Sequence, residues 1–301
     1  MNNGNIKYFS DEFLIRLNLE NEKNKINLNT DKPLISIVMP SFNQAKYIER
    51  SILSVLNQDY LNKELIIIDG GSKDGTIEIL KRYNSYIKYW ISEKDKGQSD
   101  ALNKGFKVCS GDIYCWLNSD DLFLPMAFSK AIGELSKKNK EICYGDWVYI
   151  DENDTVIDKY FAFDVDVNHL KYEGFHFSAD SIFWHKNVHK RFSGFDVKLN
   201  KTMDYQMLLE FALKQPSSAF IRTENVLGAF RRYPGQKTQD YNLEEHKEHQ
   251  YIARKYNYYD KYSFLGKLKR IFFRFRRAFW YFKRGGITEL IKRILNWKIL
   301  K

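Results

Sequence analysis

The sequence predicts an α/β protein with a doubly wound mixed sheet and helices on both faces. Between residues 34 and 121, short apolar runs alternate with amphipathic segments. Nearly continuous apolar runs are typical of strands that are buried on both faces of a parallel sheet. Strands and helices that alternate in this way build a sheet between two helical layers, and its ligands bind beyond the carboxyl ends of the strands.

The expected elements follow from the length and period of each segment. Strands are expected at residues 34–39, 64–70, 87–92 and 112–118. Helices are expected between them, at residues 45–58, 74–83 and 99–108. After residue 121 the pattern is that of an α+β continuation, with strand-like runs at residues 143–150, 155–163 and 181–186, a loop region at 164–179 and a helix at 202–214.

Composition and periodicity divide the chain into three parts. They are a lead-in at residues 1–33, a domain at residues 34–240 with halves at 34–121 and 122–240, and a helical basic extension at residues 241–301. The lead-in is rich in Asn, Lys and Glu, and one short helix is expected in it at residues 11–19. In the extension, the pair Gly285 and Gly286 separates two amphipathic helices.

The excess positive charge lies at one end of the chain. The formal net charge is +10, but residues 264–301 alone hold twelve Lys or Arg and a single acid, Glu289. The rest of the chain is therefore close to neutral, and nucleic acid is not an expected partner.

The cysteines and the first residues of the sequence indicate the cellular compartment of the protein. Cys109, Cys115 and Cys143 lack metal-ligand spacing and lie in apolar stretches, which favours free thiols in a reducing compartment. The first residues lack the pattern of a secretory signal, and no window holds 18 uncharged apolar residues. We therefore expect a cytoplasmic protein without a spanning helix.

Polar residues follow the first two expected strands. Pro40, Ser41 and Asn43 stand where the chain leaves the first strand, and Asp69 ends the second before two glycines. An ionised carboxylate only accepts hydrogen bonds, so Asp69 suits the imide N–H of uracil or a ribose hydroxyl. Asp74 is placed to cap the next helix.

Two adjacent carboxylates, Asp120 and Asp121, follow the fourth expected strand. They would repel each other unless a cation lay between them and a phosphate. Mg²⁺ or Mn²⁺, held by one or two carboxylates and a diphosphate, is the simplest partner. An exposed helix cap is the alternative explanation of the pair.

The motifs together resemble those of glycosyltransferase family 2, inverting enzymes with the nucleotide-diphospho-sugar transferase fold called GT-A. Residues 36–60 and 64–76 look like the nucleotide-binding half of that family, and GQSDALNKGF and WLNSDD look like motifs of one bacterial subgroup. The resemblance covers roughly residues 34–238. It implies that residues 34–121 bind the nucleotide and residues 122–240 the acceptor.

The resemblance also implies roles for residues of the nucleotide-binding half. Pro40, Ser41, Asn43 and Asp69 would hold the nucleotide sugar, with Asp100 as a further contact.

The metal motif of the family is Asp-x-Asp, and it ends here at Asp120, with Asp121 beside it. Asn118 replaces its first Asp, which removes one of the two carboxylates of that motif. Asp120 and Asp121 are the expected ligands of a divalent cation, Mn²⁺ or Mg²⁺.

Inverting transfer requires a general base that takes the proton of the acceptor hydroxyl. The segment GFDVKLNKTMDYQMLLEFAL resembles the one that supplies this carboxylate at a helix start, and Asp204 is the matching residue. A carboxylate at a helix start is also stabilised by the helix dipole, so the residue has a structural explanation as well. Asp196 is expected to be structural.

The segment FRRYPGQKT resembles a loop in which relatives often carry a histidine near the diphosphate. Tyr233 replaces that histidine, and a phenol is a poor ligand for a hard cation. Arg231, Tyr233 and Lys237 are expected to contact the diphosphate.

The basic tail forms an amphipathic helical pattern. Its apolar stripe consists of Phe264, Leu268, Ile271, Phe272, Phe275, Phe279 and Phe282. Phe273 and Trp280 are expected to widen this stripe, with Lys and Arg largely opposite. We expect residues 264–301 to lie on an anionic membrane surface, and packing on the body or on a partner chain is the alternative.

The sequence therefore predicts an inverting glycosyltransferase. It would move a sugar from a nucleotide diphosphate, by family default UDP, to a saccharide or lipid-linked acceptor of the cell envelope, at the inner face of the cytoplasmic membrane. One alternative is an inactive binding module associated with the membrane. A sugar nucleotidyltransferase is disfavoured, because the first strand is not followed by a Gly-rich triphosphate loop.

Overall fold

The computed structural model describes residues 32–137, 139–174, 178–237 and 243–299. The helix expected at residues 11–19 lies outside the described residues.

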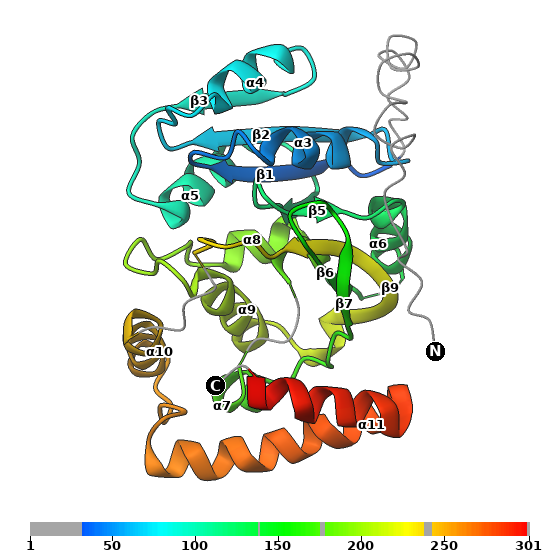
Figure 1. The fold of residues 1–301 in the computed structure, drawn as a ribbon, viewed down its shortest axis with the longest axis vertical. Helices are drawn as coiled ribbons and strands as arrows, with labels where there is room; N and C mark the ends of the chain where they lie inside the picture. Colours follow the sequence, from blue (N-terminus) through cyan, green and yellow to red (C-terminus); the bar gives the residue numbers. More distant parts are fainter. Residues whose placement is uncertain (1–31, 138, 175–177, 238–242, 300–301) are drawn as a thin grey trace.

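The first half of the chain forms the predicted alternation of strands and helices (Figure 1). Its elements are β1 (Ile35–Ser41), α3 (Ile48–Leu56), β2 (Lys63–Asp69), α4 (Thr76–Arg82), β3 (Tyr89–Ser92), α5 (Gln98–Val108) and β4 (Ile113–Trp116). The four strands are parallel and lie in the order β3-β2-β1-β4. The predicted parallel sheet is confirmed for this half.

The strand register brings the polar strand ends together. Ser41 at the end of β1 is level with Asp69 at the end of β2, and Asp69 is level with Ser92 at the end of β3. Trp116 ends β4 beside Val38, so the segment that follows β4 continues along the last part of β1. The polar segments after β1, β2 and β4 therefore leave the same edge of the sheet.

The second half of the chain makes the sheet mixed, as predicted. Its elements are β5 (Leu122–Phe123), α6 (Ala127–Leu135), β6 (Ile142–Ile150), β7 (Val156–Tyr160), α7 (Val167–Tyr172), η1 (Ala179–Ser181), β8 (Ile182–His185), α8 (Lys186–Arg191), α9 (Met203–Lys214), η2 (Ser217–Ala219) and β9 (Phe220–Arg231). In the described residues the sheet continues from β4 in the order β8-β6-β9-β5, and β7 pairs with β6. Strand β8 is antiparallel to both of its neighbours.

Several elements of the second half differ from the expectation, among them α6, α7, α8 and β9. Helix α7 lies inside the expected loop at 164–179, where the Asp166 carboxylate caps it by accepting hydrogen bonds from the N–H groups of Asn168 and His169. Strand β9 was not expected, because its middle is polar and its pairing with β6 shifts register around Asp146, which disrupts the alternation of apolar residues.

The core lies on both faces of the sheet. Ile37 and Met39 of β1 belong to an apolar cluster with α3, α4 and α6, whereas Val38 between them belongs to a cluster with α5 and α9. Successive side chains of a strand point to opposite faces, so one strand contributes to both layers. This explains the continuous apolar runs in the sequence.

Two further helices pack against the second half (Figure 1). Helix α10 (Leu243–Lys255) lies beside α9, and α11 (Phe264–Ile299) runs along one end of the molecule. Helix α11 breaks at Gly286, where φ is 71° and ψ is −168°, so the breaker pair in the sequence is confirmed. The chain turns back there, and the Arg293 guanidinium of the second arm lies 5.4 Å from the ring centroid of Tyr281 in the first.

A glycine sets the distance between α5 and the sheet, which yields a test. A Cβ on Gly105 would lie 2.4 Å from a methyl carbon of Val38. We expect Gly105→Ala to lower the free energy of unfolding by about 1–3 kcal/mol through overpacking. Gly133 of α6 has nothing within 4 Å of such an atom, so Gly133→Ala should be neutral or stabilising. Urea denaturation compares the two variants, and equal effects would contradict this account of the packing.

Candidate functional site

Asp69 lies at the centre of the strand edge and is fully buried. Its Oδ2 accepts hydrogen bonds from the N–H groups of Gly71 and Ser72, at 3.0 and 2.8 Å, and from the Ser92 hydroxyl at 2.7 Å. Its Oδ1 accepts one hydrogen bond, from the Ser72 hydroxyl at 2.5 Å. The carboxylate therefore holds the turn after β2 in place, and Oδ1 retains capacity for a further donor.

The segment after β1 lies against this turn. The Asn43 N–H donates to the Ser72 hydroxyl at 2.7 Å, and the Asn43 side-chain oxygen accepts from the Lys73 N–H at 3.0 Å. Pro40 is buried within β1. The hydroxyl oxygen of Ser41 is buried and has no hydrogen-bond partner in the described residues. A ligand with a polar group at the strand edge would satisfy that hydroxyl.

Asp95 is a residue of this edge that the sequence analysis missed. A Cβ on Gly70 would lie 3.0 Å from the Asp95 Oδ2 and 3.2 Å from a ring carbon of Phe42, so the side chains of Asp95 and Phe42 both lie close against this glycine. Asp95 follows β3 at its carboxyl end, and the rule that identified Asp69 would have identified it.

Asp100 lies farther along, in the first turn of α5. Its Oδ2 accepts from the Lys96 N–H at 3.2 Å and lies 3.3 Å from the Lys104 ammonium, and the residue is half-buried.

Asn118 replaces an acid of the family motif and makes three hydrogen bonds. Its side-chain oxygen accepts from the Trp116 indole N–H and the Gln98 amide, both at 2.7 Å. Its amide donates to the Asp121 Oδ2 at 2.8 Å, and the Asp121 Oδ1 accepts from the Arg231 N–H at 2.8 Å. Both oxygens of Asp121 thus have protein donors, which favours Asp120 as the residue that faces a ligand.

Asp120 connects three segments of the chain. Its Oδ2 accepts a hydrogen bond from the Tyr233 hydroxyl at 2.8 Å, and the Gln44 amide donates to that hydroxyl oxygen at 3.4 Å. Burial raises the pKa of Asp120 above its usual value. The segments after β1, β4 and β9 therefore meet at one carboxylate, and the tyrosine that replaces the expected histidine makes the connection.

Arg231 is fully buried at the end of β9. Its guanidinium donates to the main-chain oxygens of Asp120 and Asp151, at 2.7 and 2.9 Å, and pairs with the Asp154 carboxylate at 2.6 Å. Enclosed in this way, Arg231 holds the turn between β6 and β7 against the end of β4. The geometry does not support the predicted diphosphate contact of Arg231.

Asp204 lies in the first turn of α9. Burial raises the pKa of its carboxyl to about 6, the hydrogen bond from the Tyr205 N–H opposes this shift, and the charges of Glu245 and Glu248 add to it. A carboxylate with this pKa is ionised at neutral pH and is a stronger base than an ordinary aspartate.

Glu248 of α10 fixes the start of α9. Its carboxylate accepts hydrogen bonds from the N–H groups of Asn200, Lys201 and Thr202, at 2.7, 3.0 and 3.0 Å, and from the Thr202 hydroxyl at 2.8 Å. It therefore fixes the segment that leads into α9 with a side chain from another helix. No local sequence signal indicates this role, because the two helices are distant in the chain.

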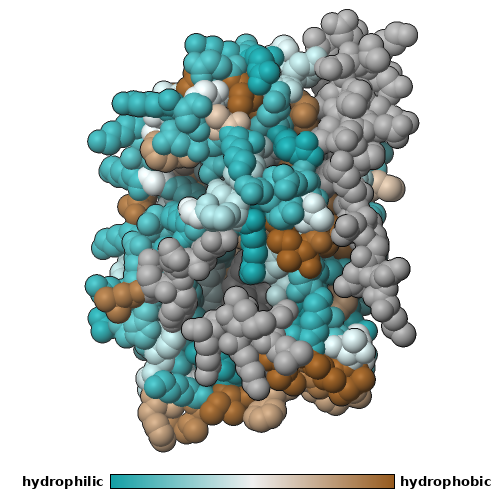
Figure 2. Space-filling view, in the orientation of Figure 1, coloured by the Kyte–Doolittle hydropathy of each residue, from teal (hydrophilic) through white to brown (hydrophobic). Residues whose placement is uncertain are grey.

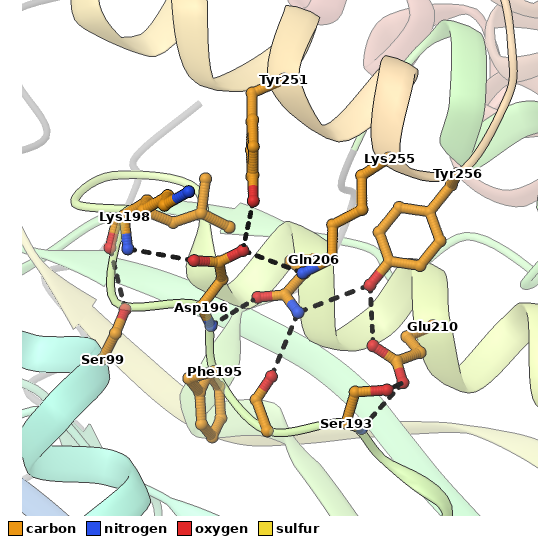
Figure 3. Close-up of polar contacts among 12 residues, drawn as sticks. Ser99, Ser193, Phe195, Asp196, Lys198, Gln206, Glu210, Tyr251, Lys255 and Tyr256 are labelled. Atoms are coloured by element: carbon orange, nitrogen blue, oxygen red, sulfur yellow. Dashed lines mark hydrogen bonds and ion pairs between the residues drawn. The ribbon is translucent and has the colours of Figure 1, made fainter.

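The loop before α9 is held by a second group of contacts, drawn in Figure 3. The Asp196 Oδ2 accepts from the Tyr251 hydroxyl at 2.7 Å and pairs with the Lys255 ammonium at 2.9 Å, both from α10. On the other side, the Ser99 hydroxyl of α5 donates to the main-chain oxygen of Leu199 at 2.8 Å. Asp196 thus has the structural surroundings that the sequence analysis expected.

The first turn of α5 lies between the two groups of acids. Gln98 contacts Asn118, two residues before Asp120, and Ser99 contacts Leu199, five residues before Asp204. The exposed Lys237 follows Tyr233 in the loop that contacts Asp120. Segments from both halves of the domain therefore border one region at the strand edge.

The carboxylates of this region are the groups that could bind a divalent cation. Within the described ranges, no group of three or more His, Cys, Asp or Glu has the arrangement of a metal site. Asp180 is buried near Asp120, and burial, more than the charge of Asp120, raises its pKa to about 7. Buried carboxylates that are short of positive partners suit a hard cation that takes most of its other ligands from a diphosphate and water.

Known proteins resemble this chain in sequence. A family profile described as Glycosyl transferase family 2 matches residues 36–201. An uncharacterized glycosyltransferase of Rickettsia bellii is 38% identical over 130 residues, which are 42% of this chain and 19% of that protein. A UDP-Glc:alpha-D-GlcNAc-diphosphoundecaprenol beta-1,3-glucosyltransferase of Escherichia coli is 36% identical over 133 residues, 44% of this chain and 52% of that protein. The chain thus spans about half or less of the length of these two relatives.

Solved structures resemble it in fold. The S. aureus TarS 1-349 complex with UDP-GlcNAc has a TM-score of 0.61 at 15% identity, over 73% of this chain and 66% of that one. The mannosyltransferase PcManGT of Pyrobaculum calidifontis, in complex with GDP-Man and Mn2+, has a TM-score of 0.56 at 14% identity, over 82% of this chain and 72% of that one. These similarities confirm the predicted GT-A fold.

The contacts of Glu248 yield a test of how α10 holds α9. We expect Glu248→Gln to lower the free energy of unfolding by about 1–3 kcal/mol, because a neutral amide accepts these N–H bonds less strongly. Hydrogen exchange of the amides of Asn200, Lys201 and Thr202 should accelerate. Lys247→Gln, at an exposed residue of the same helix, is the control. Unchanged exchange at these three amides would show that Glu248 does not fix the segment that leads into α9.

Proposed function

Because the chain belongs to glycosyltransferase family 2, we propose that it transfers a sugar from a UDP-sugar to an acceptor hydroxyl with inversion at the anomeric carbon. The observation that carries this proposal is the arrangement of acids around one strand edge. Asp69 and Asp120 border it from the nucleotide-binding half, and the α5 turn beside them contacts the loop that leads to Asp204. Such an arrangement suits inverting transfer, in which the leaving UDP and the attacking acceptor hydroxyl lie on opposite sides of the sugar.

The donor nucleotide would lie at the ends of β1 and β2. The Asp69 Oδ1 has capacity for the imide N–H of uracil, and the unpaired Ser41 hydroxyl lies at the neighbouring strand end. Pro40 and Asn43 shape this edge, and Asp100 borders it from α5. UDP is the favoured nucleotide because the names of the Escherichia coli relative and of the TarS complex both contain it.

The diphosphate would lie near Asp120, which we propose as the main protein ligand of Mn²⁺ or Mg²⁺, with Asp121 beside it. When bound, the cation neutralises the charge that develops on the leaving UDP. Tyr233 orients the Asp120 carboxylate through its hydroxyl. Lys237, exposed in the same loop, is placed to pair with a phosphate oxygen.

Asp204 would act as the general base. Its carboxylate takes the proton of the acceptor hydroxyl while the oxygen of that hydroxyl bonds to the anomeric carbon and the bond to UDP breaks. A pKa of about 6 keeps the carboxylate ionised at pH 7 and raises its proton affinity over that of a solvated aspartate. Glu248 and the loop contacts hold the start of α9, so the base has a fixed position.

The acceptor would be a saccharide or a lipid-linked saccharide of cell-envelope polysaccharide synthesis. The name of the Escherichia coli relative includes a diphosphoundecaprenol acceptor, which supports a lipid-linked substrate here. We propose that the protein works as a peripheral protein at the inner face of the cytoplasmic membrane, where such acceptors and nucleotide sugars meet.

The base assignment predicts the effect of one substitution and of pH. Asp204→Asn should lower kcat by about 10²–10⁴-fold with little change in the affinity for UDP. In the unaltered protein, kcat/KM for the acceptor should fall as pH drops through about 6, because protonated Asp204 cannot accept a proton. Steady-state transfer assays over pH and isothermal titration with UDP measure both effects. A variant that keeps a tenth or more of the activity contradicts the assignment.

The cation assignment predicts a cooperative shift in stability. Mn²⁺ and UDP together should raise Tm well above the effect of either alone, since a ligand at about 100 times its Kd stabilises by about 2.7 kcal/mol. Asp120→Asn should abolish the extra shift, whereas Asp164→Asn, at a surface carboxylate that pairs with Arg222, should keep it. Differential scanning fluorimetry makes the comparison. An equal shift in all three proteins would mean that Asp120 does not hold the cation.

A further inference from the structure

Helix α11 turns much of its positive charge toward the body of the protein. The guanidinium of Arg277 pairs with Glu173 at 2.6 Å, that of Arg284 with Asp146 at 2.9 Å and that of Arg293 with Asp158 at 3.1 Å. The three acids belong to different elements, because Glu173 follows α7, Asp146 lies in β6 and Asp158 lies in β7. Ion pairs along both arms therefore fix the rotation of α11 about its own axis.

Some of its aromatic residues face the body as well. The Phe273 ring stacks on Tyr172 with centroids 6.1 Å apart, and the Trp280 ring meets Phe163 at 5.2 Å. Tyr281 is buried, at 4% exposure. This corrects the expectation that Phe273 and Trp280 widen the outer apolar stripe, because both serve to attach the helix.

The predicted apolar stripe faces outward on the first arm, and Ile287, Ile291 and Ile294 of the second arm extend it. Its members are between 41% and 77% exposed, and they are Phe264, Leu268, Ile271, Phe272, Phe275, Phe279, Phe282, Ile287, Ile291 and Ile294. Figure 2 shows apolar side chains gathered along the end of the molecule where α11 lies. An amphipathic helix on a globular protein normally buries its apolar face, and here the cations are paired inside while the apolar face is left exposed.

The chemistry of this face favours a lipid surface as its occupant. Lys267 and Lys283 are exposed, and by helical period each lies next to the apolar stripe. Cations that border an apolar face match the headgroups of an anionic bilayer, whereas the same face on a second copy of the chain would bring like charges together. In the part of the chain that is described, no helix is long and apolar enough to cross a membrane.

We propose that the outward apolar stripe of α11 inserts in the interface of an anionic lipid bilayer, with both arms parallel to the membrane. The ion pairs to Glu173, Asp146 and Asp158 then set one orientation of the body on the membrane. This proposal deepens the one on the acceptor, because it gives a lipid-linked substrate a fixed direction of approach. Only the direction of approach of this substrate rests on the proposed function, and the insertion of the stripe in a bilayer does not.

Cosedimentation of the full chain with phosphatidylglycerol–phosphatidylcholine vesicles tests the proposal. The triple variant Phe272→Ser, Phe275→Ser, Phe279→Ser should bind these vesicles at least about tenfold less than the unaltered protein. The control triple variant Leu61→Ser, Val108→Ser, Leu213→Ser changes exposed apolar residues outside α11 and should bind normally. Equal binding by the two variants, or no vesicle binding by the unaltered protein, overturns the proposal.

Two further measurements separate this proposal from the catalytic one. The α11 variant should keep the Tm of the unaltered protein and its rate of UDP-sugar hydrolysis in solution, because its changed side chains face outward. Asp204→Asn should bind vesicles normally and lose transfer. A change in oligomeric state of the α11 variant by light scattering, without a change in vesicle binding, would identify the face as a protein interface and overturn the lipid assignment.

Discussion

The structure depends on the hydrogen bonds that stabilise carboxylates buried in the fold. Removing an ionised carboxylate from water is costly unless donors or cations surround it. Asp69 receives four hydrogen bonds from its own edge of the sheet, and Glu248 receives its hydrogen bonds from the start of α9. Asp120 and Asp204 are less fully compensated and have raised pKa values. Asp69 and Glu248 therefore hold the shape of the site, whereas the Asp120 and Asp204 carboxylates retain capacity for a further partner.

This difference has a consequence for stability. The pKa of Asp204 in the folded protein lies above its ordinary value, so the folded state binds that proton more tightly than the unfolded chain does. The stability that this residue contributes is present at low pH and is lost as pH rises through about 6. The protein therefore carries an ionised Asp204 at neutral pH at some cost to its stability, which is consistent with the general base that we propose.

The sequence allowed prediction where local chemistry decides the structure. The parallel strands appear in the sequence as continuous apolar runs, and their ends carry Asp69 and Asp120, so that half of the fold and its strand edge were predictable. Strand β9 was not, because its pairing with β6 shifts register and interrupts the period. Glu248 was not either, because it acts on α9 from another helix. The amphipathic pattern of α11 was evident, but only tertiary ion pairs determine that its cations face inward.

One structure would test the central claim most directly, namely the complex of the protein with Mn²⁺ and a non-hydrolysable UDP-sugar. The account predicts uracil beside Asp69, the diphosphate and cation beside Asp120, and the Asp204 carboxylate on the side of the anomeric carbon opposite the diphosphate. A complex in which Asp204 lies on the same side as the diphosphate, or in which the sugar lies outside the region between these residues, would contradict it.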